Sequence, residues 1–303
     1  MRITTTSPSR AMLANLQTVQ RERSESQQRV ASGKQVTKPS DDPAKVLSAL
    51  DYRQQLRRSE QMGRNAQDAE NWLNQGDSAL THTVERLTKA RTLVLQGVNG
   101  ATDQQGRNAA AAEIETILEE LLQTANTEHL DRGIFSGTAA VASAFDTTTF
   151  AYLGNQGAVD RAVAPSVTIQ VNRPGNEVFG DWVDTAGGAD PMTGNVFQIL
   201  RATADALKAG DLTVARSGLT AIDGATDGIE SVQVQLGARA LQVEEVRARA
   251  LSFDGEMRRS LSEVEDVDIL EEITTMRSRE FAYEAALNVT ARVIQPSLLD
   301  FLR

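Results

Sequence analysis

Histidine is the residue type best suited to acid, base or metal chemistry in this chain, and it occurs only twice. The chain has no cysteine, and His82 and His129 both lie in segments with a helical pattern. Neither has His, Asp or Glu neighbours at the spacing that metal sites or catalytic sites use. We therefore predict surface or packing roles for both histidines, and the sequence indicates no catalytic residue, no metal ion and no cofactor.

An acidic segment that begins at Asp223 reads DGATDGIE and shares its aspartates and glycines with calcium loops. It lacks the Asp-x-Asp/Asn-x-Asp/Asn-Gly register and the terminal glutamate spacing of an EF-hand. We interpret this segment as the solvated surface of a helix.

A second acidic run contains six carboxylates near the start of the last predicted helix. Carboxylates are expected in the first turns of a helix, because the helix dipole favours each of them by about 0.3–1 kcal/mol. The alternative is a docking strip for a cationic partner, since carboxylates this dense also repel one another. Arg53, Arg57, Arg58 and Arg64 are candidate counterparts within the chain. We favour the first interpretation for this run, which consists of Glu263, Glu265, Asp266, Asp268, Glu271 and Glu272.

Composition favours an acidic protein built from long helices. The 303 residues carry a formal net charge of −10 and are only 4% aromatic, and such a composition suits helices that pack through aliphatic stripes. The basic residues are dispersed, so we expect no nucleic acid partner. No segment approaches the ~20 apolar residues needed to span a bilayer, and the N-terminus lacks the features of a secretory signal. We expect no membrane insertion.

The two ends of the chain carry matching heptad patterns, which predicts that they pair as one coiled coil. Arg23, Ser26, Glu280 and Thr290 are polar members of this pattern and leave the pairing weak. We therefore expect both arms to be mobile in an isolated subunit and to become ordered among neighbours. The apolar seam consists of Leu16, Val19 and Val30 near the N-terminus, with Met12 before them, and of Ile273, Met276, Tyr283, Leu287 and Ile294 near the C-terminus.

Helical patterns fill most of the chain between the arms. They cover residues 44–98, 107–130 and 196–208, and after a break at Gly210 an apolar residue recurs every seven positions from Ile222 to Val264. The predicted ends of these helices rest on local signals: Gly33 after the first arm, Asp42 and Pro43 before the second helix, a joint at Gly255, and a capping box formed by Ser262 and Glu265 at the start of the last arm.

The segment 132–195 differs from the helices, since Gly, Thr, Asn and Pro replace Ala, Glu and Arg there. The run from Val167 to Val171 alternates apolar and polar residues and ends in turn residues, as a strand does. We predict a small β-rich insert. Its candidate core residues are Phe145, Phe150, Tyr152, Phe179 and Trp182.

Several linked segments resemble the bacterial flagellin family. They are the opening MRI, the segment ASGKQVTKPSDDPAKV, the stretch NQGDSALTHTVERLTKARTLVLQGVNG, and the ending EDVDILEEITTMRSREFAYEAALNVTARVIQPSLLDFLR. The resemblance implies a mainly α fold with long antiparallel helices, a terminal coiled coil and a small β-rich inserted domain. It also implies three domains: residues 1–44 with 255–303, residues 45–134 with 196–254, and the exposed residues 135–195.

Within the family, the start, the modest length and the SLLDFLR ending are more similar to the proteins of the hook–filament junction than to filament flagellin. The resemblance implies an extracellular structural protein, exported without a cleaved signal through the flagellar type III channel, whose seam residues contact other subunits. Its implied partners are copies of itself, hook-associated protein 1, flagellin and a cytoplasmic export chaperone. Filament flagellin is the alternative. An enzyme with coiled-coil arms is remote, because no convergent polar pocket is evident.

Overall fold

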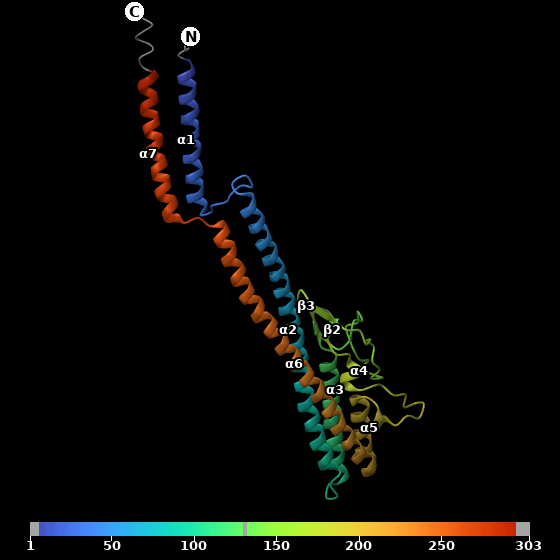
Figure 1. The fold of residues 1–303 in the computed structure, drawn as a ribbon. Coiled ribbons are helices and arrows are strands. Elements are labelled where there is room, and N and C mark those ends of the chain that lie inside the picture. Colours follow the sequence, from blue (N-terminus) through green and yellow to red (C-terminus); the bar gives the residue numbers. More distant parts are fainter. Residues whose placement is uncertain (1–5, 130–131, 295–303) are drawn as a thin grey trace, which may run out of the picture. The chain divides into compact units, whose positions relative to one another are not determined.

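The computed structural model describes residues 6–129 and 132–294, and the side chains of residues 10–129 and 132–291. Figure 1 shows long helices and two small antiparallel sheets, which confirms the predicted fold class. The helices are α1 (Thr6–Ser32), α2 (Pro43–Gly97), α3 (Gln104–Ala125), α4 (Gly175–Phe179), α5 (Val196–Ala209), α6 (Leu212–Glu265) and α7 (Ile269–Ile294), and the strands are β1 (Glu128–His129), β2 (Arg132–Gly133), β3 (Asp160–Ala164) and β4 (Val167–Gln170).

Contacts divide the chain into two compact units. The terminal unit comprises Met1–Arg58 with Ser252–Arg303, and the central unit comprises Ser59–Leu251. Helices α2 and α6 therefore each contribute residues to both units. The three-domain division inferred from the sequence stays a prediction.

The core of the central unit consists of the aliphatic stripes predicted from the sequence. Leu80, Leu87 and Val94 of α2 are fully buried, and so are Ile114 and Leu121 of α3. The heptad positions of α6 in this unit are buried as well: Ile222, Ile229, Leu236 and Val243. Each of these side chains withdraws apolar surface from water, so the central unit holds a continuous core of its own.

The insert shares this core, because its aromatic rings pack onto α5. Phe145 and Phe179 are buried as predicted, and their ring centroids lie 5.0 and 5.5 Å from that of Phe197 in α5. Strand β3 pairs with β4, and the predicted strand at 167–171 is confirmed as β4. The core assignment of Trp182 is wrong, since this side chain is 42% exposed.

Two predicted helix ends are wrong, for different reasons. Helix α6 passes through Gly255 and ends at Glu265, because one glycine costs a helix only ~1 kcal/mol. The last arm starts at α7, where the Asp268 side chain accepts hydrogen bonds from the backbone N–H groups of residues 270 and 271. Helix α3 ends at Ala125, because the side chain of Asn126 forms hydrogen bonds with the backbone of residue 145 and turns the chain away from the helix axis. His129 therefore lies in β1 and not in a helix.

We predict opposite effects of alanine at two glycines of α6. A Cβ at Gly218 would lie 2.1 Å from Oγ1 of the buried Thr203, so Gly218→Ala should lower the free energy of unfolding by about 1–3 kcal/mol. The matched control is Gly224→Ala, where a Cβ meets nothing within 4 Å. That variant should gain up to ~1 kcal/mol from helix propensity. Urea denaturation of both variants is the measurement, and equal shifts would contradict the close packing of α5 on α6.

Candidate assembly interface

Helices α1 and α7 run side by side in opposite directions within the terminal unit (Figure 1). Most predicted seam side chains are half-buried between these helices: Leu16, Val19, Val30, Ile273, Met276 and Tyr283. Leu287 is 42% exposed, and the side chain of Ile294 lies outside the described residues. The pairing of the two arms is therefore confirmed, and the contact of these residues with other subunits stays a prediction.

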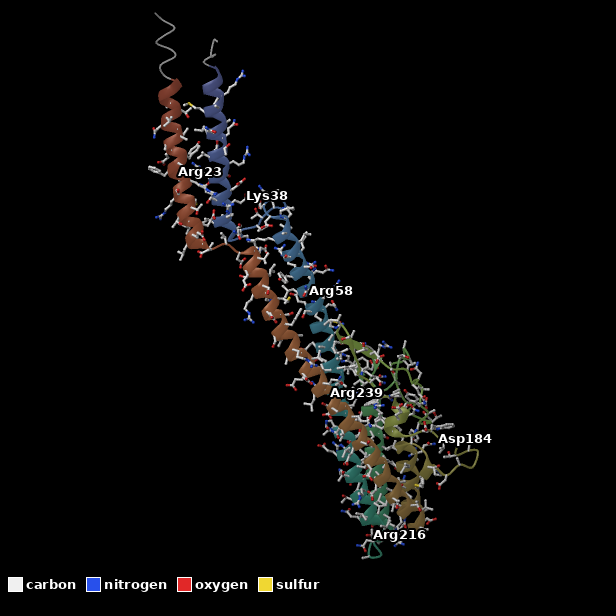
Figure 2. All side chains as sticks on the ribbon, viewed as in Figure 1. Arg23, Lys38, Arg58, Asp184, Arg216 and Arg239 are labelled. Atoms are coloured by element: carbon white, nitrogen blue, oxygen red, sulfur yellow. The ribbon has the colours of Figure 1, made fainter. Side chains whose placement is uncertain are left out.

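Polar groups hold the seam together as much as apolar ones. Ser26 is fully buried, and its hydroxyl donates to Oε1 of Glu272 over 2.5 Å. Arg29 donates to the same oxygen over 3.0 Å. The guanidinium carbon of Arg23, labelled in Figure 2, lies 4.8 Å from the ring centroid of Tyr283, a cation–π contact. These contacts connect specific pairs of residues, so they define one register between α1 and α7.

The ionisation of Glu272 contributes to this pairing. Burial by itself raises the pKa of its carboxyl. The hydrogen bonds from Ser26 and Arg29 and the positive charges of Arg29 and Arg279 lower the pKa by more than burial raises it, so it lies below its usual value of 4.5. The carboxylate is therefore more stable in the paired helices than in the separated chain. Its contribution to stability is complete above the usual pKa and is lost as the pH falls through the lowered one.

At the end of the seam, a buried carboxylate joins the segment that follows α1 to the end of α6. Glu265, only 5% exposed, accepts hydrogen bonds from the side chains of Lys34 and Arg53. The backbone N–H of Gln35 donates to the carbonyl of Glu265 over 2.7 Å, and that of Val267 donates to the carbonyl of Gly33 over 3.0 Å. Gly33 has a φ of 69° at the end of α1, as its predicted role requires. The connections after α1 and after α6 are thus bonded to each other.

The acidic run is used largely within the chain. Asp268 caps α7, which agrees with the favoured interpretation, while Glu265 and Glu272 form the ion pairs described above. Arg53 is confirmed as a counterpart, whereas Arg64 bonds to a neighbouring glutamine of its own helix. Sequence reasoning missed Arg29 and Lys34. Arg29 follows the seam residue Ser26 by three positions, which places both on one face of a helix and was the available signal.

Helix α7 also exposes large apolar side chains outside the seam. Leu270 is 80% exposed, Phe281 76% and Val289 54%. A neighbouring protein surface that packs on this helix would withdraw these side chains from water. The arrangement suits adhesion between subunits, because each helix pair leaves apolar area that a neighbour can cover.

Neither histidine adds a reactive centre to this arrangement. His82 is exposed, with Nδ1 3.7 Å from a carboxylate oxygen of Glu85. His129 packs edge-on against Trp72, with the ring centroids 5.2 Å apart. Among the residues that the structure describes, no group of three or more His, Cys, Asp or Glu is arranged to hold a metal, and no helix is long and apolar enough to cross a membrane.

We predict that acid separates α1 from α7. Because the chain lacks cysteine, single cysteines introduced at the exposed Ser24 and Ser278 can carry spin labels that report the distance between the helices. The paired population should fall as the pH drops from 6 to about 3, as Glu272 takes up a proton. Glu272→Gln is the control and should show a weaker pH dependence. An identical pH profile for the two proteins would exclude Glu272 as the titrating group.

Comparison with known proteins identifies the family. The N-terminal helical region of bacterial flagellin matches residues 3–140, and the C-terminal helical region matches residues 219–302. The chain is 23% identical over 274 residues to flagellar hook-associated protein 3 of Salmonella typhimurium, which covers 86% of each chain. It is also 23% identical over 283 residues to flagellin of Bacillus subtilis, over 91% of each chain.

A solved structure shares the fold. The flagellar junction protein from Legionella pneumophila superposes with a TM-score of 0.59 at 17% sequence identity, over 72% of this chain and 99% of that one. The two matched helical regions span more than half of the sequence, and they contain the paired α1 and α7 in full. The chain therefore belongs to the bacterial flagellin family.

Proposed function

We propose that this protein is a structural component of the bacterial flagellum and forms the junction between the hook and the flagellin filament. The observation that carries the proposal is the similarity to flagellar hook-associated protein 3 over 86% of each chain. Filament flagellin is the weaker alternative.

The terminal unit supplies a physical mechanism for this role. Its seam is half-buried in a single chain, and Leu270 and Phe281 stay exposed. Side-by-side packing of many helix pairs would bury such side chains at each contact, at about 25 cal/mol per Å² of apolar area. Weak contacts repeated around a tube add to a stable assembly, while a free subunit remains separate. The seam residues, Leu287 and Ile294 included, are the proposed subunit contacts.

The partners and the route follow from this role. The protein associates with other flagellar components; we assign it copies of itself, hook-associated protein 1 and flagellin as neighbours, and a cytoplasmic chaperone that recognises the C-terminal arm before export. Its location is the flagellum, which we propose it reaches through the type III channel without cleavage of a signal peptide. The role needs shape and adhesion and no catalysis, so we propose that the protein is not an enzyme.

Deletion of the gene tests the proposal directly. Without a junction, hooks should remain bare and flagellin monomers should leak into the medium, because the export channel still delivers subunits that nothing retains. Electron microscopy of the cells and an immunoblot of the medium are the measurements. Normal filaments would refute the role. Absent filaments without leaked flagellin would instead favour the filament subunit.

A substitution in the seam tests the interface. Leu287→Asp places a charge where a neighbour should cover an apolar side chain, and burial of an unpaired carboxylate costs several kcal/mol. Motility of a deletion strain that carries this variant should be abolished, whereas circular dichroism should show folded central helices. Leu287→Met keeps the size and the apolar character, and this control should restore motility. Full motility with the aspartate would exclude Leu287 from the seam.

A further inference from the structure

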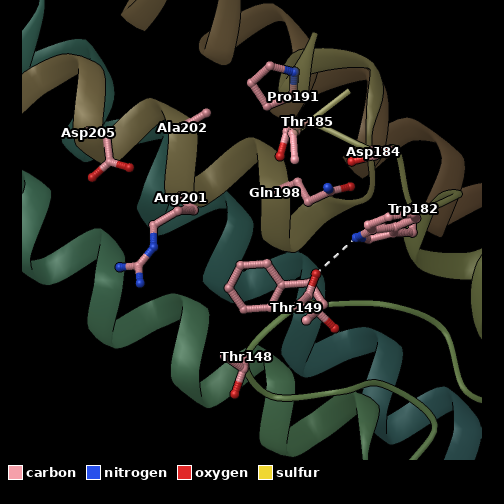
Figure 3. A pocket seen from close by; sticks show the side chains of 12 residues that line it. Thr148, Thr149, Trp182, Asp184, Thr185, Pro191, Gln198, Arg201, Ala202 and Asp205 are labelled. Carbon is pink, nitrogen blue, oxygen red and sulfur yellow. Dashed lines mark hydrogen bonds between the residues drawn. The ribbon is translucent and has the colours of Figure 1, made fainter. Parts of the chain in front are cut away.

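A hollow of about 420 Å³ opens on the surface of the central unit, where three segments of the chain meet. They are the turn at residues 148–150, the loop that contains Trp182 and Asp184, and one face of α5 with Arg201 and Asp205. Figure 3 shows Trp182 and Arg201 on opposite sides of this hollow, with Gln198 between them. It contains none of the seam residues, so the proposed assembly leaves it without a role.

Hydrogen bonds fix the walls of the hollow. The indole Nε1 of Trp182 donates to the carbonyl of Thr149 over 2.9 Å, the dashed contact in Figure 3. Oδ1 of Asp146 accepts from the backbone N–H groups of Thr148 and Thr149 over 2.9 and 2.6 Å. Gln198 bonds to both backbone groups of Val183, next to the tryptophan. Walls that are set in advance reduce the entropy lost when a ligand binds.

A strained residue lies in the same wall. Phe150 has a φ of 61°, and among the described residues no other side-chain-bearing residue has a positive φ. A bulky side chain disfavours this conformation, and strain of this kind collects at ligand sites. Nδ2 of Asn195 donates to the carbonyl of Phe150 over 2.7 Å and holds the residue in place. The fold thus maintains the shape of the hollow against a local backbone preference.

Several side chains that line the hollow can still contact or hydrogen-bond a ligand. The indole of Trp182 is 42% exposed. Within the described part of the chain, the hydroxyl of Thr148 and the carboxylate of Asp205 form no hydrogen bond or ion pair. Oδ1 of Asp184 accepts from the N–H of residue 187, which leaves its second oxygen, and Arg201 uses Nη1 for Glu115 and has further N–H donors.

These groups together match a sugar ring. A pyranose presents an apolar C–H face that can lie on an indole, and its hydroxyl groups both donate to carboxylates and accept from a guanidinium. The lining holds two carboxylates, those of Asp184 and Asp205, and a single guanidinium, that of Arg201, which already pairs with Glu115, so a negatively charged ligand is disfavoured. We propose that this hollow binds a neutral or amino-substituted pyranose ring of a saccharide.

Binding can be followed in the full-length protein through its own fluorescence. The chain has two tryptophans, and Trp72 is only 3% exposed, so a change in emission on adding sugar reports Trp182. The probes are the methyl glycosides of glucose, galactose, N-acetylglucosamine and glucosamine, with glucuronate and sialic acid as acidic comparisons. We expect a Kd on the order of 1 mM for at least one of the first four and at least ~10-fold weaker binding of both acids.

The same sugars coupled to serum albumin distinguish the source of the ligand. Binding of free and coupled sugar alike supports a site for saccharides in general, and binding of the coupled form alone supports a site for protein-attached glycans. No response to any of the probes would overturn the proposal. Acidic sugars that bind as tightly as the neutral ones would overturn it as well.

Variants connect the signal to the hollow, with affinity measured by saturation-transfer NMR, which needs no tryptophan. Trp182→Ala should weaken binding by ~10-fold or more, and Trp182→Phe, which retains a smaller aromatic face, should weaken it less. Asp205→Asn should weaken it by several fold without disturbing the fold, since that carboxylate bonds to no other residue that the structure describes. Leu153→Ala is the matched control, because Leu153 is 48% exposed on the same insert outside the hollow. Unchanged affinity in both Trp182→Ala and Asp205→Asn would refute the site.

Discussion

The terminal unit depends on a single buried carboxylate, that of Glu265. It ends α6, and its two cationic partners come from elsewhere: Lys34 follows α1, and Arg53 belongs to α2. A buried charge that loses its partner costs about 3–5 kcal/mol, so arrangements that separate these elements are strongly disfavoured. Because the adjoining backbone bonds join Gly33 to Val267, α1 ends beside the point where α7 begins. The register of the seam is therefore fixed at one end by these bonds.

The two units differ in how completely they bury their apolar stripes. Leu80, Leu87 and Ile229 in the central unit have no exposed surface, so its contacts are complete within one chain. The seam residues of α1 and α7 are only half-buried, and the flanking Phe281 is mostly exposed. Apolar burial is the main source of stability, so the apolar surface that the terminal unit leaves exposed can stabilise contacts with other molecules. This difference between the units is what a structural subunit requires, and it needs no reactive group.

Local signals in the sequence correctly predicted several helix ends and the buried stripe of α6. Asp42 and Pro43 start α2, Gly210 ends α5 in the left-handed conformation, and the heptad positions of α6 from Ile222 to Val243 are buried, all as predicted. These features follow from capping geometry and from helical periodicity, which neighbouring residues determine.

Most of the errors arose where distant residues decide the structure. Asn126 diverts the chain into β1 because of a contact with residue 145. Gly255 is the exception: it does not end α6, because one glycine costs a helix only ~1 kcal/mol. Trp182 reads as a core residue by type, yet its indole N–H bonds to a surface turn and leaves its face exposed. The partners of Glu272 lie more than two hundred residues away, at Ser26 and Arg29. No local pattern specifies such pairs, although the shared face of Ser26 and Arg29 marks one half of the contact.

The polar residues of the seam explain how α1 and α7 pair in a single register although the subunit exposes large apolar side chains. A seam of leucine and isoleucine alone would tolerate several registers, because any apolar side chain can replace another. Ser26 is fully buried and the side chain of Glu272 is 12% exposed, and a shift of α7 along α1 would leave both without this hydrogen bond. An unpaired buried polar group costs about 1–3 kcal/mol, and more when it is charged. These polar residues make the seam less stable than an apolar seam would be, but they exclude other registers between α1 and α7. The exposed apolar side chains of the subunit then stay available for contacts with neighbouring subunits.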